Sequence, residues 1–348
     1  MNIIENLFTG LGAMIYDFML WLTFPDWLAA AVLLVLKWLM VVLLVIVDVI
    51  ILIWLERKVC GYIQQRLGPN RLGPGGCFQT IADTLKLMGK EDIIPRTADK
   101  VLFILAPAIF IIISVMLYSV VPMGKDMMIA DFNLSMLFFI SVGSLGTLAL
   151  FMGGWGSDNK WSLLGAMRAV AQMISYEVPL AFSLLGVVMI TGSLQFSDIV
   201  AAQENVWFIF LQPVAFITYF ISATAELNRG PFDMPEAEQE LTAGPYTEYT
   251  GMRWALFFLA EYTNMVAVCL MCSAVFLGGW HGPAFLPSWA WMFIKAYFFI
   301  MIFFWIKWTL PRIRMDKLME FSWKFLVPVS LGNVLLTGGW PDDFSIGG

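Results

Sequence analysis

Residues 29–55 read AAAVLLVLKWLMVVLLVIVDVIILIWL, an almost unbroken run of apolar side chains in which Lys37 and Asp48 are the only charged residues. A helix needs about 20 such residues to cross the hydrocarbon core of a bilayer. This run is longer, so we predict a transmembrane helix that tilts or extends past the membrane. The rest of the sequence repeats the pattern.

The composition also indicates a membrane protein. Of 348 residues, 60% are hydrophobic and 13% are charged, against about 25% charged in soluble domains. We therefore exclude a water-soluble globular protein and predict an all-α fold, a polytopic bundle of about eight transmembrane helices forming one domain over residues 1–348. The predicted helices are 29–55, 101–121, 133–153, 174–192, 206–226, 253–278, 289–310 and 325–340.

The N-terminal stretch is interpreted differently. Residues 7–24 are apolar but contain Asp17 and are followed by Pro25, so we predict a helix lying in the membrane interface. This makes 1–28 an interfacial segment on the outer face. Residues 1–36 contain no Lys or Arg, and we expect no signal peptide because its positive n-region is missing.

The distribution of basic residues predicts the orientation. Seventeen of the twenty Lys and Arg residues fall in the loops of one side, and only Lys125 falls on the other. By the positive-inside rule, the basic side is cytoplasmic. With eight spans both termini are then periplasmic, in a bacterial cell inner membrane. A mitochondrial inner membrane is the alternative.

The loop over 56–100 carries eight of these cations and a turn-rich stretch, Gly68-Pro-Asn-Arg-Leu-Gly-Pro-Gly-Gly76. Phe78, Ile81, Leu85 and Met88 follow at spacings of three, four and three residues. This spacing predicts an amphipathic helix at the membrane surface or under another subunit. The alternative is an ordinary basic loop that holds lipid phosphates.

The loop over 226–252 is acidic, although it lies on the basic side. Arg229 is the only cation between Glu226 and Glu248. If 235–242 is helical, Asp233, Glu236 and Glu240 share one face, and such close like charges titrate as a coupled set with some raised pKa values. This behaviour suits a proton relay, and the alternative is a solvated acidic loop.

Five ionisable residues fall within or at the start of predicted spans: Lys37, Asp48, Glu177, Glu261 and Lys295. A charge at the bilayer centre costs about 3 kcal/mol or more, so such residues usually face a polar pathway. A single structural hydrogen bond to a neighbouring helix is the alternative for each. Taken with the acidic loop, Glu177 and Glu261 favour a chain of protonatable groups leading inward from the cytoplasmic face.

The residue inventory limits the chemistry. His281 is the only histidine, which excludes a bis-histidine haem within the chain. The four cysteines, Cys60, Cys77, Cys269 and Cys272, are interpreted as small buried residues, because the pairs lie at different depths and cannot meet around one cluster. We expect no metal site, no nucleotide site and no nucleic-acid partner, so any redox centre must belong to another chain.

Three long motifs lie on the predicted inner side. The first combines Glu56-Arg-Lys58, Gln65-Arg-Leu-Gly-Pro-Asn-Arg71 and Gln79-x3-Asp83-x2-Lys86; the second combines Asn228-Arg-Gly-Pro-Phe-Asp-Met-Pro-Glu-Ala-Glu238 with Thr247-Glu-Tyr249-x-Gly251; the third is Ile174-Ser-Tyr-Glu177-Val-Pro179. At these motifs the chain resembles the H subunit family of proton-translocating NADH–quinone oxidoreductases, which includes a membrane subunit of mitochondrial respiratory complex I.

The resemblance implies a function as part of a larger translocase. The family's subunit lies at the junction of the peripheral and membrane arms, forms most of a quinone tunnel and opens the membrane proton route. The implied substrate is a quinone, with ubiquinone expected, and no cofactor is bound covalently. FMN and iron–sulfur clusters are implied in partner subunits. The implied partners are peripheral-arm quinone-module subunits, small membrane subunits and membrane lipids.

The resemblance also assigns residues. It places Glu56, Arg57, Arg229 and Asp233 at the tunnel, with Lys295 as a further candidate on the quinone path. It implies a relay of acids, which are Glu177, Glu236, Glu240 and Glu261, with Glu238 and Glu248 as further candidates. Arg168 is a candidate for supporting the quinone path or the interface.

Two other functions stay open at this point. One is the related membrane subunit of a proton-pumping hydrogenase or ferredoxin-linked complex, which has no quinone substrate. The other is a stand-alone ion or solute transporter, which would work when purified alone in liposomes.

Overall fold

The computed structural model describes residues 14, 25–125, 127–235, 241–283 and 285–339. The interfacial helix predicted over 7–24 therefore lies outside the described residues, apart from residue 14. Within the described residues the secondary structure is helical and contains no strands, which confirms the all-α prediction.

Six helices are long and apolar enough to cross a membrane among the residues that the structure describes. They are α2 (Asp26–Ile63), α4 (Lys100–Met116, continued by a 3-10 turn to Ser119), α5 (Ser135–Gly156), α6 (Lys160–Thr191), α11 (Gly251–Phe276) and α12 (Ser288–Thr309). The chain is therefore a multi-pass membrane protein. These helices correspond to six of the eight predicted spans.

The fifth predicted span is helical but interrupted. It divides into α8 (Phe208–Leu211) and α9 (Pro213–Glu226), with Gln212 outside helical geometry at φ −128° and ψ 57°. A residue before proline is sterically disfavoured from the helical region, and Gln212 is followed by Pro213. The break is stabilised because the Gln212 side chain donates to Thr337 Oγ1 at 2.8 Å and accepts from Asn333 Nδ2 at 2.7 Å.

The eighth predicted span is also irregular. The predicted range 325–340 corresponds to α14 (Val327–Gly338), with Pro328 in its first turn. The helical segment begins earlier than predicted, with α13 (Met315–Phe321) and a π-helical turn (Ser322–Leu326). Proline lacks the N–H that would continue the hydrogen-bond ladder. At the same place Ser322 Oγ donates to the Ser175 carbonyl on α6 at 2.6 Å.

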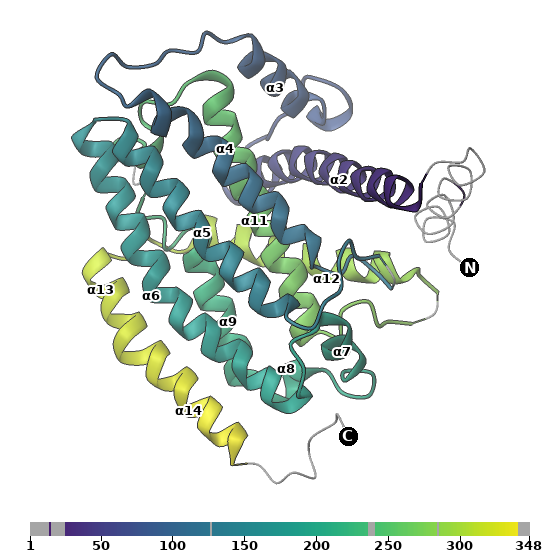
Figure 1. The fold of residues 1–348 in the computed structure, drawn as a ribbon. Coiled ribbons are helices and arrows are strands. Elements are labelled where there is room, and N and C mark those ends of the chain that lie inside the picture. Colours follow the sequence, from purple (N-terminus) through teal and green to yellow (C-terminus); the bar gives the residue numbers. More distant parts are fainter. Residues whose placement is uncertain (1–13, 15–24, 126, 236–240, 284, 340–348) are drawn as a thin grey trace.

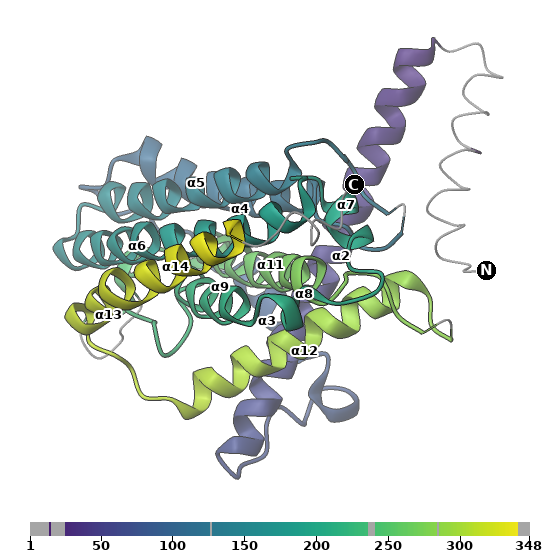
Figure 2. The same cartoon turned by 90° about the horizontal axis from the view of Figure 1, so that it is seen from below.

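The helices form a compact bundle beside one outlying helix. In Figure 1, α4, α5, α6 and α9 lie side by side with α11 behind them, and α13 and α14 cover the outside of α6. Figure 2 shows the N-terminal half of α2 standing apart from this bundle. Leu34, Val35, Leu39 and Leu43 on that half are exposed, as expected for side chains that contact lipid. The other end of α2 contacts α3, α11 and α12.

The predicted amphipathic helix is present as α3 (Gln79–Gly89). In an amphipathic helix of a soluble protein the apolar face is buried. Here the apolar side chains Phe78, Ile81, Leu85 and Met88 are exposed, whereas the polar Thr80 is buried. The remaining short elements are α7 (Phe196–Ala201) and the 3-10 turns at Pro74–Gly76 and Gly244–Tyr246.

Candidate functional site

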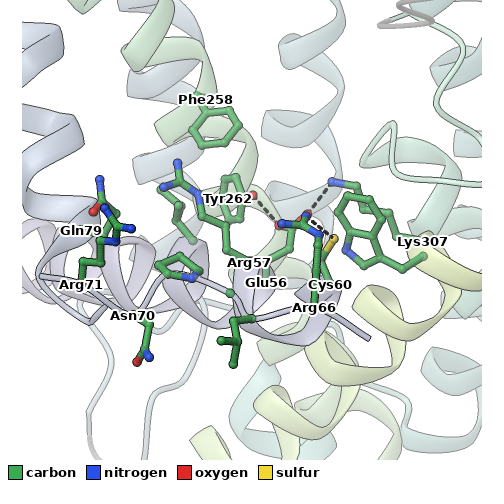
Figure 3. Close-up of a pocket in the computed structure, with 15 residues that line it drawn as sticks. Glu56, Arg57, Cys60, Arg66, Asn70, Arg71, Gln79, Phe258, Tyr262 and Lys307 are labelled. Carbon is green, nitrogen blue, oxygen red and sulfur yellow. Dashed lines mark hydrogen bonds and ion pairs between the residues drawn. The ribbon is translucent and has the colours of Figure 1, made fainter. Parts of the chain in front are cut away.

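A chamber of about 880 Å³ lies where the C-terminal end of α2 meets α11, α12 and the loop before α3. Figure 3 shows its side chains converging from these elements. The lining residues are Ile53, Glu56, Arg57, Cys60, Arg66, Leu67, Gly68, Pro69, Asn70, Arg71, Gln79, Phe258, Tyr262, Lys307 and Trp308. The chamber is thus a polar, basic space bordered by aromatic and aliphatic walls.

Glycines allow the chamber's loop to fold back on α2. A Cβ atom at Gly61 would lie 2.9 Å from the backbone nitrogen of Gly68, so α2 and the loop can touch only without a side chain there. Gly76 has φ +78°, and a Cβ atom would meet the Pro69 carbonyl oxygen at 2.2 Å. The turn-rich stretch in the sequence therefore brings Arg66 and Arg71 back to the end of α2.

Glu56 is the centre of a buried charge cluster. It is 4% exposed, and its Oε1 accepts from Lys307 Nζ at 2.5 Å. Its Oε2 accepts a hydrogen bond from the Tyr262 hydroxyl and lies 3.8 Å from Arg229 Nη1. A buried charge is tolerated only when it is paired and hydrogen-bonded, and these three partners meet that requirement.

Arg229 joins this cluster to a second acid. Its Nη2 lies 3.9 Å from Glu261 Oε2, while its guanidinium lies 4.3 Å from the centre of the Tyr262 ring. The other oxygen of Glu261 accepts from the Tyr246 hydroxyl at 2.7 Å. Arg229 therefore links the carboxylates of α2 and α11, which makes the two acids electrostatically dependent on each other.

An apolar groove of about 300 Å³ adjoins the chamber between α2, α3 and α11. The groove and the chamber share three lining residues, Ile53, Arg57 and Phe258. Its other walls include Ile46, Val49, Ile50, Leu87, Trp254, Ala255 and Leu259. The polar chamber thus lies directly beside a groove whose mostly apolar walls suit a hydrocarbon chain.

An ion pair connects α2 to α3 at this junction. Arg57 Nη1 donates to Asp83 Oδ2 at 2.5 Å, and Gln79 donates to the other Asp83 oxygen at 3.3 Å. Partial burial raises the pKa of Asp83, but the hydrogen bond and charge of Arg57, together with Gln79 and Lys86, outweigh this effect and hold the pKa below its ordinary value of 3.8.

This pair leads to a prediction for α3. A carboxyl whose pKa is lowered by folding stabilises the fold at all pH values above its unfolded pKa, and the stabilisation is lost only as pH falls through the lowered value. Amide exchange in residues 79–89, corrected for intrinsic rates, should therefore be unchanged from pH 8 to pH 5.5. Asp83→Asn should accelerate it by up to about fivefold, because exposed pairs contribute at most about 1 kcal/mol.

Hydrogen–deuterium exchange on the assembled protein measures both effects, with Asp131→Asn in an outer loop as the control. Loss of α3 protection between pH 8 and pH 5.5 would contradict the lowered pKa of Asp83.

A second, much smaller chamber of about 30 Å³ lies deeper in the bundle, on the far side of Glu261. It is lined by Glu226, Asn228, Glu261 and Asn264 among apolar side chains. Glu226, at the end of α9, is also close enough to Glu177 on α6 to interact with it electrostatically. Glu261, Glu226 and Glu177 therefore form a series of acids on α11, α9 and α6.

Comparison with known proteins places the chain in a family. A model of the family described as NADH dehydrogenase matches residues 36–338. The chain belongs to this family. It is similar to the NADH-quinone oxidoreductase H subunit of Carboxydothermus hydrogenoformans, with 49% identity over 337 residues that cover 96% of each chain. It is also similar to the H subunit of Geobacillus kaustophilus, with 51% identity over 286 residues covering 81% of this chain and 86% of that protein.

The family resemblance inferred from the motifs is confirmed by these matches. Both relatives are subunits of NADH-quinone oxidoreductase, a membrane-bound oxidoreductase complex. Their names do not refer to a hydrogenase, which was one of the alternative functions.

In this member of the NADH dehydrogenase family, the structure places several of the predicted site residues close to one another. Glu56 and Arg57 line the chamber, and Arg229 and Glu261 lie next to Glu56. Asp233 follows Arg229 by four residues in the same loop, and its Oδ2 pairs with Arg312 Nη2 at 3.0 Å.

The other acids predicted for the relay lie outside the cluster around Glu56 or outside the described residues. Glu177 lies on α6, and its Oε1 is buried without a hydrogen-bond partner in the described part of the chain. Glu248 accepts a hydrogen bond from Asn159 Nδ2 at 2.6 Å and does not line either chamber. Glu236, Glu238 and Glu240, with the helix predicted over 235–242, lie outside the described residues.

Lys295 lies away from the chamber. Its ammonium donates to the carbonyl oxygens of Leu277, Gly279 and His281 at 2.7–2.8 Å, at the C-terminal end of α11. Lys307, which does line the chamber, is twelve residues further along α12, or about 18 Å at 1.5 Å per residue. Lys295 does not line the chamber, and its contacts indicate that it holds the turn that follows α11. The tunnel role of Lys295 stays a prediction.

We expect Lys295→Met to destabilise the protein by about 1–3 kcal/mol, because three buried carbonyl oxygens lose a charged donor. Hydrogen exchange should rise at residues 276–282, while the KM for quinone stays unchanged. Lys125→Met, an exposed outer-loop substitution, is the control in thermal unfolding of the assembled complex. A changed KM without increased exchange would instead support the original tunnel prediction.

Several central residues were missed by the sequence analysis. Lys307 was counted only as a loop cation, and Tyr246, Tyr262 and Asn264 were not singled out. Glu226 was included only in the acidic loop, although its position at the end of a span was a usable signal. Asp48 accepts a hydrogen bond from the Tyr297 hydroxyl on α12, which supports the structural alternative for that residue.

The described residues contain no group of three or more His, Cys, Asp or Glu side chains placed to hold a metal ion. Cys269 and Cys272 are free and buried in α11, as predicted for small apolar residues. Cys60 lies at the chamber wall.

Proposed function

We propose that the chamber receives the head group of a quinone and that the adjoining groove holds the first part of its apolar tail. The observation that carries this proposal is that the two spaces lie against each other and share Ile53, Arg57 and Phe258 in their walls. A quinone has the same division, with a polar ring that hydrogen-bonds at two oxygens and a long hydrocarbon chain. The names of the relatives support a quinone as the substrate.

The charges around the chamber suit the reduction chemistry. A quinone takes up two electrons and two protons to become a quinol, and negative charge develops on its oxygens between these events. Arg57, Arg66, Arg71 and Lys307 line the chamber and would stabilise that charge, since cations placed beside developing negative charge lower its energy. Electrons would come from FMN and iron–sulfur clusters in partner subunits.

The coupling step would run through the charge cluster. When the head group becomes negative, it competes with Glu56 for Lys307 and with the acids for Arg229. Glu261 then loses part of the cationic stabilisation that Arg229 supplies, and its affinity for a proton rises. The route would continue from Glu261 to Glu226 and Glu177, with Asp233, Glu236, Glu238, Glu240 and Glu248 as proposed members on the loop side.

The surroundings follow from the same proposal. The subunit would reside in a bacterial inner membrane with the chamber near the cytoplasmic face and both termini periplasmic. The basic chamber loop and the acidic loop would contact peripheral-arm subunits, while small membrane subunits and lipids would cover the apolar faces.

A groove-filling variant tests the proposal. Ala255 lies in the groove wall, so Ala255→Trp should block the tail but leave the head chamber unchanged. In the assembled complex, reduction of a long-tailed quinone should fall about tenfold or more, the consequence of losing roughly 1.4 kcal/mol of tail binding. Reduction of a quinone with a one-unit tail should change little.

Ala30→Trp on the exposed N-terminal half of α2 is the matched control, because it adds the same side chain on a lipid-facing surface. Equal loss for short and long tails would indicate a general folding defect. Full activity with the long tail would exclude the groove as the tail site.

A further inference from the structure

The small chamber between Glu226 and Glu261 has the properties of a water site. Its volume of about 30 Å³ exceeds the roughly 10–15 Å³ needed to hold one water. Four polar side chains contribute to its lining, two carboxyl groups and the amides of Asn228 and Asn264. The other walls are Phe110, Leu117, Phe139, Gly143, Met173, Leu227 and Val268, so the polar groups are gathered within an apolar enclosure.

The side-chain oxygen of Asn264 lacks a hydrogen-bond donor at this chamber among the described residues. It lies one turn after Glu261 on α11, at a spacing that puts both side chains on the same face. Its Oδ1 is buried and has no hydrogen-bond partner within the described residues. Buried polar atoms are nearly always hydrogen-bonded, to protein or to ordered water. A water in the chamber would satisfy Asn264 Oδ1.

Asn228 is fixed in position at the opposite wall. Its backbone is in the left-handed region at φ +49°, and its Oδ1 accepts from Gln172 Nε2 at 3.2 Å. Among the described residues, its Nδ2 donates to the weak acceptor Met173 Sδ, at 3.8 Å. An amide nitrogen carries two protons, so Asn228 retains a donor for a second contact.

We propose that Asn228 and Asn264 hold a water molecule that passes protons between Glu226 and Glu261. This inference deepens the proposed relay and rests on it. In one direction, protonated Glu261 gives its proton to the water while the water gives one of its own to the Glu226 carboxylate. The net change is neutral Glu226 and ionised Glu261, with the water regenerated. Asn264 is a positioning residue in this step and holds no proton itself.

The argument for a single relay water comes from the enclosure. Among the described residues that line the chamber, the polar side chains are these two amides and the two carboxyl groups, and on its other side Glu261 is engaged by Arg229 and Tyr246. A proton that crosses the chamber from Glu261 to Glu226 therefore passes between the two amides.

Two substitutions at Asn264 test the inference in the assembled complex. Asn264→Leu keeps the size of the side chain but removes both polar atoms, and it should lower quinone-reduction turnover about tenfold or more, within the range for losing a positioned proton-transfer group. The solvent deuterium isotope effect on turnover should increase, because proton transfer becomes limiting. Asn264→Ser keeps a hydroxyl and leaves room for water, so it should retain turnover within about twofold.

Asn333→Leu is the matched control, since it removes a buried amide that bonds Gln212 elsewhere in the bundle. If both leucine variants lower turnover equally with an unchanged isotope effect, Asn264 is only structural and the inference fails. Full turnover in Asn264→Leu also overturns it. A high-resolution map of the wild-type complex provides a check without variants, and it must contain water density within hydrogen-bonding distance of Asn264 Oδ1.

The relay itself is tested separately by Glu261→Gln. If Glu261→Gln stops turnover and Asn264→Leu does not, the water site is wrong and the proposed relay stands. If neither substitution affects turnover or proton pumping, the proposed relay is wrong.

Discussion

Replacing Glu56 with leucine is expected to destabilise the protein by about 3–5 kcal/mol, the loss seen when one partner of a buried ion pair is removed. Lys307 would lose its 2.5 Å contact, Arg229 would lose one of its two carboxylate neighbours, and the Tyr262 hydroxyl would lose its acceptor. The buried cluster would then hold less negative charge against the same two cations. We expect the assembled complex to unfold at a lower temperature and to lose quinone reduction.

Glu320→Leu is the control for this experiment. Glu320 also pairs with two lysines, Lys317 and Lys324, at 2.9 and 2.6 Å, but the lysine side chains are 69% and 75% exposed. Exposed pairs contribute between about 0 and 1 kcal/mol. Glu56→Gln keeps the size of the side chain and an acceptor oxygen for the Tyr262 hydroxyl but removes the negative charge. It therefore distinguishes the effect of losing the charge from the effect of losing the shape. If Glu56→Leu is as mild as Glu320→Leu, the buried cluster does not organise the site.

The second large effect is expected from Glu261→Gln. Glutamine preserves the size of the side chain and an oxygen for Tyr246, so the complex should assemble. It cannot release or accept a proton, and it removes one of the two carboxylates beside Arg229. Turnover should fall about 100-fold, a typical loss when an essential acid–base group is removed, and proton translocation should stop with it.

Proteoliposomes containing the assembled complex allow quinone reduction and proton uptake to be measured together. Glu204→Gln, an exposed residue of the outer loop before α8, is the matched control and should retain both activities. A Glu261→Gln complex that pumps protons with an unchanged ratio to quinone reduced would remove Glu261 from the relay.

The helices were predictable because membrane burial leaves a simple signal. Within the described residues, each of the eight predicted spans is helical, although two are irregular, and the spacing of Phe78, Ile81, Leu85 and Met88 correctly predicted α3. The interruptions were less visible, although Pro213 and Pro328 marked them. Whether a proline kinks a span or divides it depends on its neighbours, and here Gln212 is held by Asn333 and Thr337 from a distant helix.

The candidate site was predicted only in part, because its pairs are long-range. Glu56 and Lys307 are 251 positions apart and Glu56 and Tyr262 are 206 apart, and nothing in the local sequence of either partner indicates the other. Motif resemblance identified Glu56, Arg229 and Glu261, but not the side chains that neutralise them. Lys295 shows a second difficulty, since a lysine within a span can bind the backbone of a turn as well as border a substrate path, and the sequence alone does not distinguish the two.

The most direct test of the central proposal is photo-crosslinking of the assembled complex with a quinone that carries a photoreactive group on its ring, followed by peptide mapping. The proposal predicts labelled peptides from 53–71 and from the end of α12 around Lys307 and Trp308, with labelling suppressed by excess unmodified quinone. Labelling that is equally suppressed but falls on other segments, with none in these two, would contradict a quinone head group in this chamber.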